Sequence, residues 1–155
     1  IVHAYDEWGI NCIKEFDGMW SFCIFDKEKK KIILSRDFFG EKPLFFSFKD
    51  KEFIFGSEIN YLFFFNNNLK QINEKKINDY LINGYKSIFK DYNTYFKNIN
   101  FVEPGSILEF NLNNFSLNKK KINIFSKVPI SSKDDENLNI AKEIFLTGYK
   151  KRIKS

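Results

Sequence analysis

Cysteine and histidine are almost absent, since Cys12, Cys23 and His3 are the only residues of these two types among 155. Two cysteines cannot build a disulfide framework, and with one histidine they cannot complete a four-ligand zinc site. No apolar run reaches the roughly 18 residues that a membrane helix needs, and no signal peptide is visible. We therefore expect a reducing cytoplasmic setting, with no membrane partner and no metal site.

Arginine is also scarce, because Arg36 and Arg152 are the only two among 25 basic residues. The net charge is +5, but the lysines are scattered along the chain. A nucleic-acid interface would cluster its positive charge. Lys, Phe, Ile and Asn share A/T-rich codons, so the base composition of the genome accounts for the excess of lysine. We expect no nucleic-acid partner.

What the chain does contain is a core-forming composition, with 43% hydrophobic and 29% charged residues. A chain of this size can bury roughly 70% of its unfolded surface. It begins at Ile1 inside a helical pattern that Gly9 ends, and it stops at Ser155 without a tail. We expect a fragment of a longer, globular protein.

Alternating apolar residues predict a series of strands joined by short polar turns, which we interpret as an antiparallel meander. The strands are expected at 19–26, 32–35, 44–48 and 52–55. Both faces of the first strand are apolar, so we expect it to be buried on both sides, with Cys23 in the core. Helices on one face of the sheet and a second sheet on the other would supply that cover.

Capping residues and spacing predict the helices that follow. Ser57 can cap a helix that begins at Glu58 and turns Ile59 and Leu62 inward. Asn73 can cap a second helix, which Gly84 would end. Its apolar residues at helical spacing are Ile77, Tyr80 and Leu81.

The last part of the chain predicts a hairpin, a linker and one more helix. Pro104-Gly105 forms a turn before a strand at 106–110, and a polar turn at 111–118 leads to a returning strand at 121–125. Residues 126–136 are polar and lack a period, which is typical of an interdomain linker. Beyond them an apolar helical face is formed by Leu138, Ala141, Phe145 and Tyr149.

The densest cluster of polar and special residues is the segment from Ser35 to Pro43. Gly40 can adopt a positive φ, and Pro43 fixes φ before the next strand. Asp37 can accept bonds from loop N–H groups, and the Arg36 guanidinium can donate to a carboxylate or to carbonyls. Two interpretations stay open: a buried polar staple that shapes the loop, which the residue chemistry favours, and a loop that lines a polar ligand pocket.

Four motifs in register resemble one known family, the glutamine amidotransferase domain of asparagine synthetases. They are EFDGMWSFCIFD at 15–26, SRDFFGEKPLFF at 35–46, FIFGSEINYL at 53–62 and NINFVEPGSIL at 98–108. Further stretches are similar to the same family, and they are LINGYKSIF at 81–89, TYFKNI at 94–99 and IAKEIFLTGYKKRIKS at 140–155. The last of these resembles the first helix of the synthetase domain, so the resemblance covers essentially the whole chain.

This resemblance implies an α+β fold of the N-terminal-nucleophile hydrolase type, a partial four-layer α/β/β/α sandwich with antiparallel sheets. It implies that residues 1–125 are the C-terminal part of the amidotransferase domain, that 126–136 are a linker, and that 137–155 begin an α/β synthetase domain. In the family, glutamine is hydrolysed and the ammonia passes to a second domain, which uses ATP and Mg²⁺ to convert aspartate to asparagine. These cofactors are implied for the synthetase domain and not for the part present in this chain.

The resemblance carries over no catalytic or substrate-binding residue. The family mechanism depends on an N-terminal cysteine whose own α-amino group serves as the base. Residue 1 is Ile1, and neither Cys12 nor Cys23 has a free amine beside it, so we expect the chain to be inactive alone. The residues that match family motifs near the site, with an implied supporting role, are Arg36, Asp37, Gly40, Pro43, Ser57 and Glu58.

Three departures from the family pattern keep alternatives open. Phe45-Phe46 stands in place of a tyrosine pair, Glu103 in place of a proline, and Glu41 in place of an aliphatic residue. Versions with Glu-Lys-Pro occur in asparagine-synthetase-like enzymes of surface-polysaccharide clusters, so the acceptor could be a sugar-linked carboxylate. A non-catalytic sandwich domain that serves as an interaction module is the other alternative. The oligomeric state is open, with a homodimer among the expectations.

Overall fold

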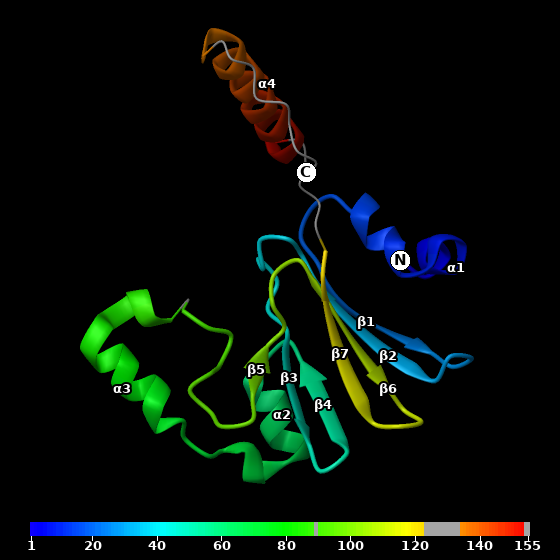
Figure 1. The fold of residues 1–155 in the computed structure, drawn as a ribbon, viewed down its shortest axis with the longest axis vertical. Helices are drawn as coiled ribbons and strands as arrows, with labels where there is room; N and C mark the ends of the chain where they lie inside the picture. Colours follow the sequence, from blue (N-terminus) through cyan, green and yellow to red (C-terminus); the bar gives the residue numbers. More distant parts are fainter. Residues whose placement is uncertain (89, 123–133, 154–155) are drawn as a thin grey trace. The chain divides into compact units, whose positions relative to one another are not determined.

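The computed structural model describes residues 1–88, 90–122 and 134–153 (Figure 1). It divides into two compact units, Ile1–Asn123 and Ile124–Ser155, which are described separately below. The first unit combines helices with antiparallel sheets, which confirms the expected α+β class. Among the described residues no helix has the length and apolar character needed to cross a membrane.

Two antiparallel sheets form the first unit. Sheet A has the order β1-β2-β6-β7 and sheet B has the order β4-β3-β5. The strands of sheet A are β1 (Ser21–Asp26), β2 (Lys31–Arg36), β6 (Ser106–Asn111) and β7 (Ser116–Lys121). Those of sheet B are β3 (Phe45–Lys49), β4 (Glu52–Gly56) and β5 (Asn100–Phe101).

The predicted single meander is wrong, although its four strands are present. β1 and β2 form one hairpin in sheet A, and β3 and β4 form another in sheet B. The segment 37–44 separates the hairpins, and its hydrogen bonds hold it as a loop between the sheets. Strand periodicity is a local signal. It therefore located the strands but could not show that this loop leads from one sheet to the other.

Helical segments connect and flank the sheets. In the first unit they are α1 (Val2–Trp8), η1 (Gly9–Glu15), α2 (Ile59–Phe65), η2 (Asn67–Leu69), α3 (Glu74–Asn83) and η3 (Gly84–Ser87). Gly9 and Gly84 end α1 and α3 with φ values of 57° and 62°, as predicted. The Asn73 side chain caps α3 by accepting a bond from the Lys76 N–H, also as predicted.

The predicted cap of α2 is wrong. The helix begins at Ile59, its N-cap is Glu58, and no side chain there makes a capping hydrogen bond. β4 continues through Gly56, and Glu58 still has extended backbone with φ −132° and ψ 142°. Ser57 therefore lies too early in the chain to cap the helix. Leu62 is buried on the inner face of α2, as expected.

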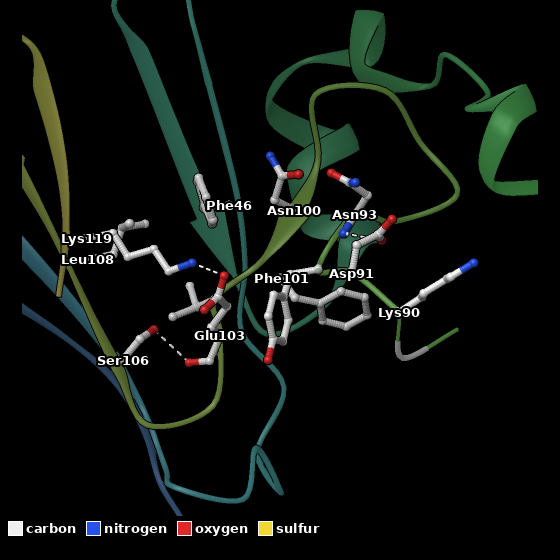
Figure 2. A pocket seen from close by; sticks show the side chains of 12 residues that line it. Phe46, Lys90, Asp91, Asn93, Asn100, Phe101, Glu103, Ser106, Leu108 and Lys119 are labelled. Atoms are coloured by element: carbon white, nitrogen blue, oxygen red, sulfur yellow. Dashed lines mark hydrogen bonds and ion pairs between the residues drawn. The ribbon is translucent and has the colours of Figure 1, made fainter. Parts of the chain in front are cut away.

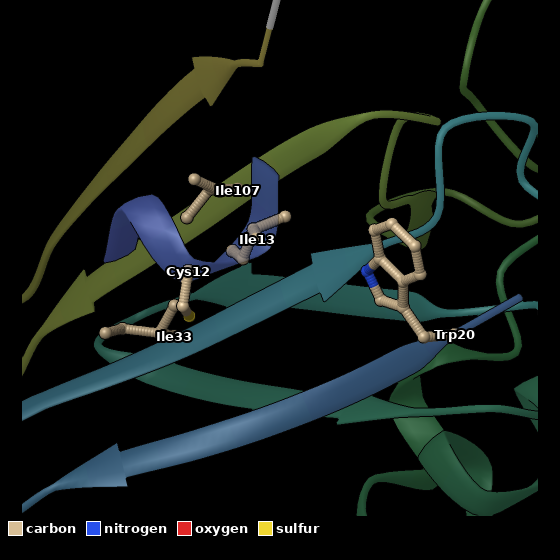
Figure 3. Packing of buried hydrophobic residues seen from close by; sticks show 5 residues of the cluster. All are labelled: Cys12, Ile13, Trp20, Ile33 and Ile107. Carbon is tan, nitrogen blue, oxygen red and sulfur yellow. The ribbon is translucent and has the colours of Figure 1, made fainter. Parts of the chain in front are cut away.

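Three hydrophobic clusters hold the first unit together. The first joins η1 to one face of sheet A through Cys12, Ile13, Trp20, Ile33 and Ile107 (Figure 3). The second lies between the sheets, where Leu34 and Leu108 meet aromatic side chains of β3 and β4. The third joins sheet B to α2 through Leu62 and Ile54. Cys12 is fully buried in the first cluster.

The expected burial of both faces of β1 is wrong. Phe22 and Ile24 pack into the first cluster, but Cys23 is exposed and Phe25 is 55% exposed. Both exposed side chains lie on the face of sheet A that packs against sheet B, but sheet B covers that face at other strands. β1 is the outermost strand, and sheet B has only three strands. Cys23 is therefore a surface residue and not part of the core.

The apolar face predicted for α3 is only partly covered by the rest of the unit, because Ile77 is half-buried and the Tyr80 ring packs on Tyr95. Leu81 is 74% exposed and Tyr80 is also exposed, whereas Lys76 on the same helix is buried. α3 makes its contacts chiefly with η3, which follows it directly, so neither sheet receives that face. Helical periodicity identified the helix but could not show which side is packed.

The returning strand begins earlier than the predicted 121–125, so the turn predicted at 111–118 is too long. β7 begins earlier, with Ser116 paired to Asn111 and Lys121 paired to Ser106. Side-chain amides tighten the preceding turn, because the Asn111 Oδ1 accepts the Asn113 N–H and the Asn114 Oδ1 accepts the Ser116 N–H. Residues 123–125 lie outside the described part of the chain.

The second unit contains one described element, α4 (Asp134–Ile153). Most of the expected linker, 126–133, lies outside the described residues, while Asp134–Glu136 form the first turn of α4. The helix expected from 137 onward is present, and its apolar side chains Leu138, Phe145 and Tyr149 are exposed.

Candidate functional site

Asp37 is the centre of the loop that follows β2. Its side chain is 1% exposed and accepts three backbone hydrogen bonds. Oδ1 accepts from the N–H groups of Phe39 (3.1 Å) and Glu41 (2.9 Å), and Oδ2 accepts from that of Lys42 (2.9 Å). Because one short acidic side chain satisfies three donors, the loop has a fixed shape.

The ionisation of Asp37 follows from the same contacts. Burial opposes the charged form, but the N–H groups of Lys42, Glu41 and Phe39 outweigh burial and hold the pKa of the carboxyl below its ordinary value. The carboxylate is therefore ionised at neutral pH and serves as an acceptor only. The sequence-based expectation that Asp37 binds loop N–H groups is confirmed.

Arg36 ties this loop to the strand region on its other side. Nε donates to the Lys42 carbonyl (2.8 Å) and Nη2 to the Gly40 carbonyl (2.6 Å). Nη1 donates to the Val102 carbonyl at 2.9 Å, and the guanidinium lies 5.7 Å from the ring centre of Phe101. Arg36 thus braces β5 and the residue after it against the loop, with carbonyls as its acceptors.

Gly40 and Pro43 fit the loop for different reasons. Gly40 has a φ of 68°, and a Cβ at this position would lie 2.8 Å from the Cγ of Pro104. Both the backbone conformation and the close approach require glycine. Pro43 precedes the buried Leu44, whose carbonyl accepts the Val102 N–H at 2.8 Å.

A pocket of about 470 Å³ opens beside this braced region (Figure 2). Its wall combines β3 and β5 of sheet B with β6 and β7 of sheet A. The residues that line it are Phe46, Lys90, Asp91, Tyr92, Asn93, Asn100, Phe101, Val102, Glu103, Ser106, Leu108 and Lys119. Aromatic rings and amide groups therefore stand close together in one concave surface.

One side of the pocket carries an internal ion pair. The Lys119 ammonium contacts the Glu103 carboxylate, as Figure 2 shows, and lies 5.6 Å from the ring centre of Tyr92. Burial, together with the nearby charge of Lys121, lowers the pKa of Lys119. The Ser106 hydroxyl donates to the Glu103 carbonyl at 2.7 Å, which fixes the turn before β6.

The opposite side is held by a buried lysine. The Lys76 ammonium donates to the carbonyls of Ser87 (3.2 Å) and Ile88 (3.4 Å) and to Asp91 Oδ1 (2.7 Å). The hydrogen bond from Lys76 is the main cause of the lowered pKa of Asp91. α3 is thereby fastened to the segment that carries Asp91, Tyr92 and the rest of that wall.

The structure brings some of the predicted site residues together and places the others elsewhere. Arg36, Asp37, Gly40 and Pro43 come together in one loop, but none of them lines the pocket. Arg36 contacts the lining residues Phe101 and Val102, so the loop lies behind the wall. The contacts match the staple interpretation, and a supporting role at a functional site stays a prediction.

Other residues could not have been placed from sequence. Ser57 and Glu58 belong to the approach to α2 and do not line the pocket. Lys76 escaped sequence reasoning because its acceptors lie on another segment, and a lysine in a first helical turn is ordinarily solvated.

Neither cysteine lies in a reactive setting within the site. Cys12 is fully buried, and burial raises the pKa of its thiol. Cys23 lies on β1 and does not line the pocket. Among residues 1–88, 90–122 and 134–153, no group of three or more His, Cys, Asp or Glu side chains is arranged to hold a metal ion.

The chain is similar in sequence to a known protein family and to several curated proteins. A family model described as a glutamine amidotransferase domain matches residues 1–121. The chain is 35% identical over 152 residues to an asparagine synthetase [glutamine-hydrolyzing] of Bacillus subtilis, covering 97% of this chain and 20% of the relative. It is 45% identical over 76 residues to a putative asparagine synthetase of Methanocaldococcus jannaschii, covering 49% of this chain and 14% of that protein. The chain thus spans about a fifth or less of these curated relatives.

Proposed function

The chain belongs to the glutamine amidotransferase domain family, and on that premise we propose that it is part of a glutamine-dependent asparagine synthetase. In this proposal residues 1–125 are the C-terminal part of the glutamine-hydrolysing domain. Residues 126–136 link it to residues 137–155, which begin the ATP-dependent synthetase domain. Ammonia released from glutamine would be used to amidate aspartate.

One observation carries this proposal. The similarity to the Bacillus subtilis relative extends over 152 residues, whereas the amidotransferase match ends at residue 121. The relative therefore resembles this chain both in the two-sheet unit and in the region of α4. A free-standing interaction module would account for the first unit but not for the shared continuation into the second.

The packing supports a partial four-layer α/β/β/α arrangement. One cluster joins η1 to sheet A, a second lies between the sheets, and a third joins sheet B to α2. In each sheet both faces thus meet other elements of the unit, as the proposed sandwich requires.

The proposed chemistry assigns glutamine hydrolysis to a terminal cysteine that this chain does not supply. Such a cysteine uses its own α-amino group as the base, and that amine has a pKa near 8 in model compounds. Cys12 is inaccessible in the core, and Cys23 lies in the middle of β1. We therefore propose that the 155-residue chain alone does not hydrolyse glutamine.

In this proposal the site residues predicted from the sequence have structural roles. The Arg36–Asp37 loop would support the hydrolase site by fixing the strand ends beside it, with Gly40 allowing the close turn against Pro104. Pro43, Ser57 and Glu58 would set the directions in which β3 and α2 leave the same region. All of these are supporting and not catalytic roles.

ATP and Mg²⁺ belong to the proposed synthetase domain. The described residues offer no acidic cluster for a metal ion, so no step is assigned to either group here. We also propose glutamine and aspartate as substrates, a homodimer as the assembly and the cytoplasm as the location. The two free cysteines support a reducing compartment.

The test compares this chain with the native polypeptide, meaning the full product translated from its gene. We expect glutamine-dependent ammonia release from the native polypeptide and none from residues 1–155. Replacing the proposed terminal cysteine by alanine should abolish release, whereas Cys23→Ser should leave it unchanged. Ammonia release from the 155-residue chain, or from the variant without the terminal cysteine, would refute the assignment.

A further inference from the structure

We draw no further inference here: the strongest candidate, the pocket of about 470 Å³ lined by residues of β5 and β7, carries none, because its two carboxylates, Glu103 and Asp91, already pair with lysines of the chain and nothing in the described residues shows which ligand would fill it.

Discussion

At the scale of single residues, Asp37 is the most constrained side chain in the loop after β2. It is buried and accepts three backbone hydrogen bonds as a carboxylate. An amide at this position offers one acceptor atom instead of two and places a donor where the carboxylate meets an N–H group. The energetic role of Asp37 therefore depends on its charge.

We predict that Asp37→Asn lowers the free energy of unfolding by about 1 to 3 kcal/mol at pH 7. The folded-state pKa of Asp37 lies below its unfolded value, so its contribution is complete above the unfolded pKa, near 4, and is lost as the pH falls through the folded pKa. Urea titrations at several pH values between neutral and acid would show a smaller acid-dependent loss in the variant. Asp50→Asn, in an exposed turn, is the control and should change little. A variant as stable and as acid-sensitive as the parent would contradict this view of Asp37.

Gly40 provides a second test at the residue scale. Gly40→Ala combines a φ of 68° with a contact of 2.8 Å to Pro104, so a loss of about 2 to 4 kcal/mol is expected. Gly9→Ala has a similar φ but no atom within 4 Å, and should cost only about 1 to 2 kcal/mol. Denaturant midpoints of the two variants measure the difference. Equal losses would mean that the contact with Pro104 does not matter.

At the scale of elements, the link from α3 to one pocket wall depends on Lys76. Lys76→Met removes three hydrogen bonds and leaves the partly exposed Asp91 able to regain water. We predict a loss of about 1 to 3 kcal/mol in stability and faster amide hydrogen exchange at residues 90–93. The neighbouring exposed Lys75→Met is the matched control. Unchanged exchange in the Lys76 variant would show that this lysine does not hold the wall.

At the same scale, some elements and contacts could be predicted from the sequence and others could not. Local signals located α1, the strands of both hairpins and the caps of α3, because alternation, Asn73 and Gly84 act within a few residues. The same signals treated two hairpins as one meander and placed Cys23 in the core, because sheet membership and cover depend on distant segments. The Asp37 bonds could be expected from loop chemistry, whereas the Lys76 contacts and the pocket required the fold.

At the scale of the whole molecule, several large apolar side chains of the described residues are exposed. They include Phe25 on β1, Phe65 on α2 and Leu81 on α3. Where such side chains lie together, they mark contacts with other segments or partners. Together with a span of about a fifth of the Bacillus relative, they agree with a chain that works within a longer polypeptide.

The proposed function assigns these residues to glutamine-dependent asparagine synthesis. The most direct measurement supplies the native polypeptide with glutamine labelled with ¹⁵N in its amide, together with aspartate and ATP–Mg²⁺, and follows the label by mass spectrometry. We expect asparagine with ¹⁵N in its amide group. Label that stays in glutamine, or that leaves as ammonia without entering asparagine, would contradict the proposed function.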